Sequence, residues 1–333
     1  MIAGVLWTLG FFSEAGATTF KIATLAPDGT TWMKEMRAGA EEIKQQTNGR
    51  VEFRFYPGGV MGNAGNVLRK MRIGQLNGGA FASGEVASVY SGVQIYSLPF
   101  LFRSYDEVDY VRQQMDEQLI ANMSDKGLVP IGISEGGFAY MMSDKPLLKV
   151  VDLKGRRVWI PEGDAISQAM FNAAGISPIP LPIADVYTGL QTGLVDTVAN
   201  STTGAIAFQW HARMNRVTDA PMLLIIGMLV VDKKALDKIS TEDRAVVLKV
   251  MTAAFKRLNR LNREDDAKAR EALIKQGVTF DKPSENEVMH WREIAKQALA
   301  RLGAENVYPR DLLEAVQGHL STYREQSRSS NAQ

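Results

Sequence analysis

The chain has no cysteine and only three histidines among its 333 residues. The absence of cysteine excludes disulfides, thiol nucleophiles, cysteine metal sites and a lipid-modified N-terminal cysteine. His211, His290 and His319 lie far apart, with no carboxylate or second histidine at ligand spacing. We therefore expect neither a metal site nor a cofactor.

An excess of charge of either sign is also missing. Lys and Arg number 38 against 37 Asp and Glu, which gives a net charge of +1. Nucleic acids and anionic membranes select basic surfaces, so we expect no nucleic-acid partner, and a small molecule or another protein instead. With 45% hydrophobic and 23% charged residues, the chain has enough apolar material for two cores.

Apolar runs long enough to cross a membrane are absent as well. The first residues are apolar through Phe12, and the small-x-small pattern Ala15-Gly16-Ala17 that follows is typical of signal peptidase sites. We expect a signal peptide over 1–17, although the usual basic residues before the apolar run are missing. Export of a chain without disulfides predicts a soluble protein of the periplasm.

Strand and helix patterns alternate along the remaining chain. FKIATL (20–25) is typical of a buried strand, and Thr30 or Thr31 is a candidate N-cap for the helix that follows. RVEFRFY (50–56) alternates apolar and polar residues, which predicts a second strand. Strand, helix and strand in this order indicate a βαβ unit and a parallel sheet.

The same alternation continues and predicts an α/β fold with two lobes. Residues 241–276 predict one long helix, capped by Ser240 or Thr241, with an apolar stripe on one face. The final residues, 326–333, are expected to be disordered. Further helices are expected over 66–73, 106–126, 165–174 and 184–192, and further strands at GGAFAS, LVPIGIS, GRRVWIP, SPIPLP and VDTVAN.

One motif raises the alternative of a secreted serine hydrolase. Gly132-x-Ser134-x-Gly136 matches the G-x-S-x-G nucleophile elbow of α/β hydrolases. An elbow needs a helix directly after the serine, whereas GGFAYMMSDKPL is typical of another strand. A triad would also have to recruit His211 or His290. The context therefore favours a glycine-rich crossing between lobes, and we expect no catalytic residues.

Four stretches give the chain a resemblance to a known family. They are ATLAPDGTTW, SLPFLFRSYDEV, VVDLKGRRVWIP and GISPIPLPIADVYTGLQTGLVDTVANS, which follow one another at the family's spacing. In these stretches, and over nearly the whole mature chain, the sequence resembles the solute receptors of TRAP (tripartite ATP-independent periplasmic) transporters, of the dicarboxylate-receptor type.

The resemblance implies a two-lobed periplasmic binding protein fold, with hinge strands and a long helix that link the lobes. It implies a receptor that closes on a small organic acid and delivers it to the TRAP membrane permease subunits, which a sodium gradient drives. A receptor for a membrane sensor is the alternative. We expect a monomer. The expected boundaries are 18–137 plus 225–264 for the first lobe and 138–224 plus 265–325 for the second.

The family's ligand-binding residues carry over unevenly. Asn200 matches the family's ligand-binding asparagine, and Phe138 matches the aromatic residue of its GFR segment. The arginine that normally follows this aromatic is Ala139 here, and the family's principal carboxylate-binding arginine falls on Trp159. Burying a carboxylate without its partner costs about 3–5 kcal/mol. The customary clamp is therefore excluded.

Two explanations for the missing clamp remain open. Another cation binds the ligand, for which Arg69, Arg72 and Arg213 are candidates, or the ligand presents an apolar or aromatic part to Trp159. An indole can stack on a ring and donate one hydrogen bond from its N–H. Arg156 and Arg157 lie earlier in the strand, where surface salt bridges are expected. The predicted ligand contacts are Trp159, Asn200, Phe138, Trp32, Ser83 and Trp210.

Overall fold

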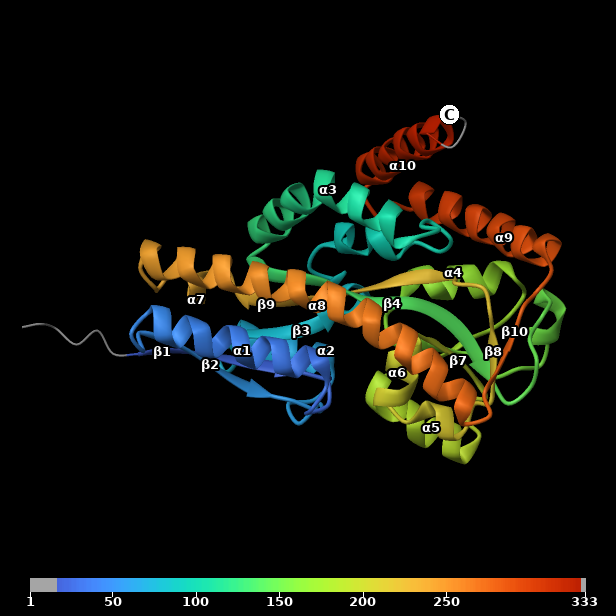
Figure 1. Ribbon diagram of the computed structural model, residues 1–333, viewed down its shortest axis with the longest axis horizontal. Coiled ribbons are helices and arrows are strands. Elements are labelled where there is room, and N and C mark those ends of the chain that lie inside the picture. Colours follow the sequence, from blue (N-terminus) through green and yellow to red (C-terminus); the bar gives the residue numbers. More distant parts are fainter. Residues whose placement is uncertain (1–16, 331–333) are drawn as a thin grey trace, which may run out of the picture.

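The computed structural model describes residues 17–330 and has two α/β lobes joined by long strands and one long helix (Figure 1). The expected α/β, two-lobed fold class is confirmed. Apart from Ala17, the expected signal peptide lies outside the described residues. In the described part, no helix is both long and apolar enough to cross a membrane.

The first lobe is built on three strands and two connecting helices: β1 (Thr18–Thr24), α1 (Thr31–Gln46), β2 (Val51–Tyr56), α2 (Ala64–Arg72) and β3 (Gly78–Ala82). β1 pairs in parallel with β2 on one side and with β3 on the other, as the βαβ pattern predicts. The hydroxyl of Thr30 caps α1 by accepting a hydrogen bond from the Met33 N–H. Local sequence signals thus determine the secondary structure of this lobe.

Two long antiparallel strands, β4 (Leu128–Ser143) and β9 (Leu223–Asp232), cross from the first lobe into the second. β9 also pairs with β3, whereas the far half of β4 pairs with β7 (Thr197–Asn200) and β8 (Arg216–Thr218). The parallel pairing expected from the βαβ pattern is thus present among β1, β2 and β3, but the whole sheet is mixed, because β9 runs antiparallel to β3 and β4.

The second lobe contains short strands and helices: β5 (Trp159–Pro161), α4 (Ala165–Ala173), β6 (Ile179–Leu181), α5 (Val186–Thr192), α6 (Thr202–Ala207) and β10 (Thr279–Asp281). β5 and β6 pair in parallel, and a bridge between Val158 and Thr197 sets β5 beside β7. β10 pairs in parallel with β8 at the opposite edge. The carboxyl ends of β5 and β7 are therefore neighbours.

Helix α8 (Thr241–Lys275) runs along both lobes (Figure 1). Its 35 residues span about 52 Å at 1.5 Å per residue. The side chains of Phe255 and Leu258 belong to the core of the first lobe, and Leu273 belongs to a core of the second. Ser240 caps the helix by accepting from the Asp243 N–H at 3.0 Å, as expected.

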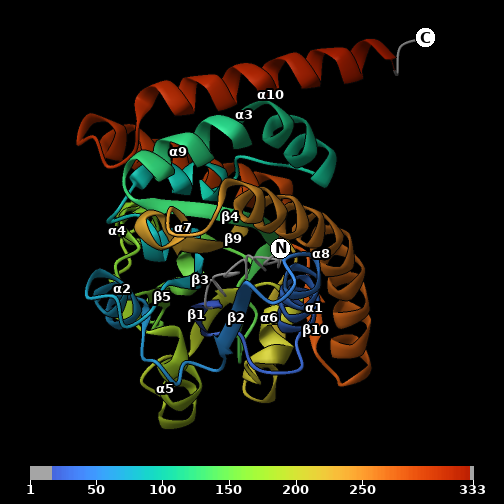
Figure 2. The ribbon, with the colours of Figure 1, turned by 90° about the vertical axis from the view of Figure 1, so that its left-hand side faces the viewer.

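Three helices cover the outside of the crossing: α3 (Tyr105–Asp125), α9 (Glu285–Ala304) and α10 (Arg310–Ser330). α9 packs on α4, whereas α10 packs on α3 and on the 3-10 segment η2 (Ser91–Ser97) (Figure 2). The expected boundaries place α10 in the second lobe, whereas α3 and η2, on which it packs, belong to the expected first lobe. α10 also continues helical through Ser330, into the tail expected to be disordered from residue 326.

The remaining helical elements are short: η1 (Ser83–Val86), η3 (Val150–Leu153), η4 (Ile183–Asp185), η5 (Trp210–Ala212) and α7 (Lys233–Leu236).

Candidate functional site

Asn200 is the last residue of β7 and lies opposite Tyr140 of β4. The residue is 6% exposed, and its Oδ1 accepts a hydrogen bond from the Ser201 N–H at 2.8 Å. A Cβ on Gly204 would lie only 2.3 Å from this oxygen. Glycine at position 204 therefore allows the amide of Asn200 to rest against the first turn of α6.

Phe138 lies on β4, and its ring packs on that of Tyr105 with 5.0 Å between the centroids. The guanidinium of Arg263 covers the Tyr105 ring at 4.4 Å. The Tyr105 hydroxyl is buried and has no hydrogen-bond partner among the described residues. Burial, and then the nearby Asp266 carboxylate, raise the pKa of this phenol. A neutral donor thus lies beside Phe138, and no sequence signal pointed to it.

Trp159 and Trp210 form an aromatic pair inside the second lobe. Their rings meet edge to face, with centroids 5.1 Å apart, and they are 3% and 0% exposed. The Trp159 indole N–H donates to the Leu181 carbonyl oxygen at 3.0 Å. The Trp210 N–H is buried without a partner among the described residues. The hydrogen bond that we expected Trp159 to offer a ligand is therefore used within the protein.

Trp32 lies on α1 at the crossing strands. Its ring meets that of Phe255 edge to face at 5.6 Å, and a Cβ on Gly227 of β9 would lie 2.5 Å from the indole. Ser83 follows β3 and is 3% exposed, and its hydroxyl shares a hydrogen bond with that of Ser97 at 3.1 Å. Both residues of the first lobe are thus held by internal contacts.

Glu85 lies in a small pocket at the carboxyl ends of β1 and β3, beside Leu25 and Met61. Its Oε2 accepts a hydrogen bond from the Ala82 N–H at 2.9 Å. Burial raises the pKa of this carboxyl to about 7, because few polar groups offset the loss of solvation. Sequence reasoning missed this residue, although its place after a strand was a usable signal.

The two positions that match the family's arginines hold Ala139 and Trp159, so neither position supplies a cation. Both residues are buried. Arg69, Arg72 and Arg213, the alternatives expected from the sequence, are all exposed. Arg69 donates to the Asn66 side chain at 2.8 Å.

Arg156 and Arg157 form the salt bridges expected of them. Arg156 pairs with Asp144 and, at 3.2 Å, with Asp196, and Arg157 pairs with Asp196 at 3.0 Å. These two cations are thus engaged at the outer end of β5, away from its carboxyl end.

A buried ionic network lies under the crossing. Glu135 of β4 is 0% exposed and accepts from Arg112 of α3 at 3.0 Å and from Arg263 of α8 at 2.8 Å. Each arginine also pairs with an aspartate of α3, Arg112 with Asp116 and Arg263 with Asp109. The network ties one strand to two helices, and sequence reasoning did not find it.

Ser134, the candidate nucleophile, is fully buried in the middle of β4. Its hydroxyl donates to the Asn259 side-chain oxygen at 2.6 Å, and no described histidine hydrogen-bonds to it. The strand continues past it, whereas a nucleophile elbow would turn into a helix. The described residues also contain no group of side chains arranged to hold a metal ion.

The two lobes also touch each other directly. The Asn63 amide of the first lobe donates to the Glu162 carboxylate of the second at 3.4 Å. Ile166 of α4 shares a hydrophobic cluster with Phe81 and Val86 of the first lobe. The two lobes are therefore in contact in this conformation.

Comparison with known proteins agrees with this architecture. The family described as Bacterial extracellular solute-binding protein, family 7 matches residues 22–306. The C4-dicarboxylate-binding periplasmic protein DctP of Rhodobacter capsulatus is 24% identical over 277 residues, which cover 80% of this chain and 82% of that protein.

Solved structures show the same fold. A TRAP periplasmic solute-binding protein from Shewanella oneidensis, with bound succinate, superposes with a TM-score of 0.85 at 20% identity over 92% of this chain and 100% of that one. One from Xanthobacter autotrophicus, with bound β-D-galacturonate, gives a TM-score of 0.84 at 20% identity over 91% of this chain and 99% of that one. The match to the family covers most of the chain, so the resemblance seen in the sequence is confirmed: this chain belongs to the bacterial extracellular solute-binding proteins of family 7.

Proposed function

We propose that this chain is the periplasmic receptor of a TRAP transporter. It captures a small organic acid between its lobes and delivers it to a sodium-driven permease. The observation that carries this proposal is the match of residues 22–306 to the family, together with the match of the two-lobed fold, over 91–92% of the chain, to receptors crystallised with succinate and galacturonate. The chain is a monomer in this proposal and has no nucleic-acid partner.

Binding works by hinge closure. A ligand that contacts both lobes at once favours the closed form, because only that form makes all the contacts. The crossing strands β4 and β9 and the helix α8 provide the connections about which the lobes move. The permease then recognises the closed form.

Neutral donors take the place of the missing arginines. The Asn200 amide and the Tyr105 hydroxyl are the donors, because one ends a strand of the second lobe and the other is buried without a partner among the described residues. Phe138 and Trp159 supply apolar surface, which suits an acid with an aromatic or aliphatic part. Trp210, Trp32 and Ser83 support the site from behind, since each is held by internal contacts.

The chain is not an enzyme in this proposal. The full burial of Ser134 and its hydrogen bond to Asn259 support a structural role for this serine. An ester-hydrolysis assay tests it, with no hydrolysis expected. Activity that disappears in Ser134→Ala would instead support the hydrolase.

A thermal-shift screen tests the receptor. The probes are succinate, galacturonate, benzoate and, as a neutral analogue, galactose. A ligand at about 100 times its Kd adds about 2.7 kcal/mol to the free energy of unfolding, which raises the melting temperature by several degrees. We expect an acid to give the largest shift. A response to galactose alone would contradict an organic-acid receptor.

Variants then locate the site with the acid that gives the shift. Asn200→Ala should abolish the shift, and Asn172→Ala, on the exposed side of α4, is the matched control that should keep it. Trp159→Phe should lower stability yet keep binding, because the lost N–H serves Leu181 and not the ligand. An unchanged shift in Asn200→Ala would place the ligand elsewhere.

A further inference from the structure

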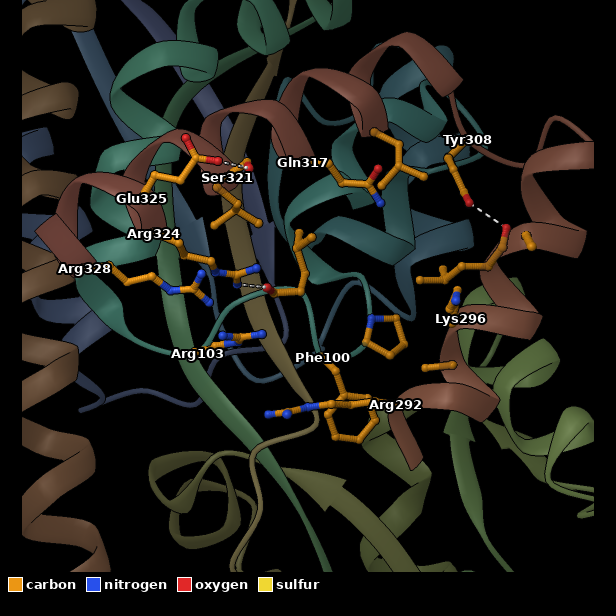
Figure 3. Close-up of a pocket in the computed structure, with 17 residues that line it drawn as sticks. Phe100, Arg103, Arg292, Lys296, Tyr308, Gln317, Ser321, Arg324, Glu325 and Arg328 are labelled. Carbon is orange, nitrogen blue, oxygen red and sulfur yellow. Dashed lines mark hydrogen bonds between the residues drawn. The ribbon is translucent and has the colours of Figure 1, made fainter. Parts of the chain in front are cut away.

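A second hollow lies outside the space between the lobes. It is a cavity of about 650 Å³ between α9, α10 and the segment from 99 to 103 that precedes α3 (Figure 3). We call it the α9–α10 pocket. Its volume falls within the range of small-molecule sites, about 300–1,000 Å³. None of the six predicted ligand contacts lines it.

The side chains around the α9–α10 pocket carry a marked excess of positive charge. They come from three different segments, and Glu325 is the one acidic side chain of the lining. Figure 3 shows the guanidinium groups of Arg103, Arg324 and Arg328 converging in the same space. The cations of the lining are Arg103, Arg292, Lys296, Arg324 and Arg328.

Most of this charge is not neutralised within the chain. Arg324 pairs with Glu107 at 2.7 and 2.9 Å and donates to the Leu101 carbonyl oxygen. Among the described residues, the other four cations have no acidic partner within 4.0 Å. Glu325 accepts a hydrogen bond from the Ser321 hydroxyl. Three guanidinium groups therefore keep free donors at the pocket.

These cations act on one another. Partial burial lowers the pKa of Arg103, and the neighbouring guanidinium groups of Arg324 and Arg292 lower it further. Like charges at this spacing repel, and an anion bound among them would offset the repulsion. Arginine suits this role, because its planar fork binds a carboxylate or phosphate through two parallel hydrogen bonds.

The rest of the pocket is apolar. Leu299 of α9 and Leu320 of α10 line it together with Phe100. Phe100 has a φ of 56°, in the left-handed region that bulky residues avoid, and its N–H donates to the Met222 carbonyl oxygen at 2.6 Å. The chain thus holds an aromatic ring at the pocket in a costly backbone conformation. Apolar walls next to free guanidinium groups match an anion with a hydrocarbon body.

We propose that the α9–α10 pocket is a second binding site, which takes a small organic anion with two or more carboxylate or phosphate groups. The charged groups of the ligand pair with Arg103, Arg292 and Arg328, and its body lies against Phe100 and Leu320. Because α9 packs on α4 and α10 packs on α3, such a ligand bridges elements of the two lobes at a place away from the cleft.

Titration calorimetry of the mature chain at low ionic strength tests the site. The probes are benzene-1,3,5-tricarboxylate, which has a planar body, and inorganic pyrophosphate, which has none. We expect one site per chain and tighter binding of the tricarboxylate. The double variant Arg103→Gln/Arg292→Gln should weaken binding at least about tenfold, since it removes charge-assisted hydrogen bonds. If pyrophosphate bound more tightly than the tricarboxylate, the result would still support an anion site, and its ligand would be a phosphate and not a carboxylate.

Two controls separate this site from unspecific charge and from the cleft. Arg54→Gln/Lys249→Gln removes the same charge from exposed positions on β2 and α8 and should leave binding unchanged. Asn200→Ala, which the proposed function places in the cleft, should also leave it unchanged. Three results would overturn the proposal. The charge control could weaken probe binding as much as the Arg103→Gln/Arg292→Gln variant does, Asn200→Ala alone could abolish probe binding, or neither probe could bind the unaltered chain.

Discussion

The carboxylate of Glu135 and the guanidinium of Arg263 meet through two hydrogen bonds, 2.8 Å from Nε to Oε2 and 3.0 Å from Nη2 to Oε1. This pair joins β4 to α8, two of the elements that connect the lobes. Glu135 is also bonded through its backbone, whose carbonyl oxygen accepts from Asn262 at 2.6 Å. The two connecting elements are therefore held together at this point.

Replacing Glu135 by Gln should destabilise the chain strongly. The substitution leaves the buried Arg112 and the partly exposed Arg263 without the carboxylate that both of them contact, and breaking a buried pair costs about 3–5 kcal/mol. Urea unfolding measures the change. Glu264→Gln is the control, because its pair with Arg260 is exposed and worth about 1 kcal/mol or less. Equal effects of the two substitutions would show that the network contributes nothing.

Gly137→Ala should also destabilise the chain, through a clash as well as through the backbone. Gly137 has a φ of 92°, and a Cβ there would lie 2.9 Å from the Ser201 Cβ and 3.2 Å from Asp266 Oδ2. Gly277→Ala is a matched control, since Gly277 has a φ of 88° with nothing within 4 Å. In urea unfolding, Gly137→Ala should lower the free energy of unfolding by about 1–3 kcal/mol more than Gly277→Ala does, which is the usual cost of overpacking. Equal losses of stability in the two variants would show that the clash at position 137 has no effect.

Glu85 should make the first lobe less stable as the pH rises. Its carboxyl has a pKa of about 7 in the folded chain and about 4.5 when unfolded, so between these values the folded state binds more protons. The contribution to the free energy of unfolding is thus fully present below pH 4.5 and is lost as the pH rises through 7. The loss is about 2 kcal/mol after allowance for partial exposure.

Glu85→Gln tests this dependence. The variant should be more stable than the unaltered chain at pH 8, and the difference should shrink towards pH 5, as urea unfolding at both values would show. Glu117→Gln on the exposed side of α3 is the control and should not alter the profile. A variant that is less stable at pH 8 would mean that the hydrogen bond from the Ala82 N–H to the carboxylate outweighs the cost of burying its charge.

Gly204→Ala should weaken ligand binding by moving Asn200. A methyl group at position 204 would overlap the Asn200 Oδ1, 2.3 Å from the ideal Cβ, and would push the amide off the first turn of α6. Calorimetry with the acid found in the thermal-shift screen should show at least tenfold weaker binding, since a charge-assisted hydrogen bond is lost. Gly318→Ala, in a helix with open space around it, should bind normally. Normal binding by both variants would exclude Asn200 from the site.

The first lobe could be predicted from the sequence because its signals are local. The period of β2 and the cap of α1 lie within a few residues of the elements that they set. The mixed sheet could not be predicted, because β4 pairs with β9 some 90 residues further along the chain and no local pattern encodes that partner. The ion pair of Glu135 could not be predicted either, because its partner Arg263 lies 128 positions away in the sequence.

The site was harder to predict than the fold. An indole at the end of a buried strand has the same sequence signature whether it faces a ligand or a core, and the structure places Trp159 against Trp210 and Leu181. The resemblance supplied Asn200 and Phe138 as candidates. It did not supply Tyr105, whose buried hydroxyl has no partner among the described residues, or Glu85, whose carboxyl has a pKa raised by burial. Solvation of a side chain depends on distant segments, so composition and spacing could not reveal it.

Because α8 is one continuous helix, it also sets the rotation of one lobe relative to the other about the helix axis. Leu258 belongs to one lobe and Leu273 to the other, and both sit on the same rigid coil. Deleting one residue between them would rotate everything that follows by about 100° and draw it back by about 1.5 Å. Single substitutions on the exposed side of this helix should usually change stability by about 0.5 kcal/mol or less. A change in its length would instead misalign the two lobes.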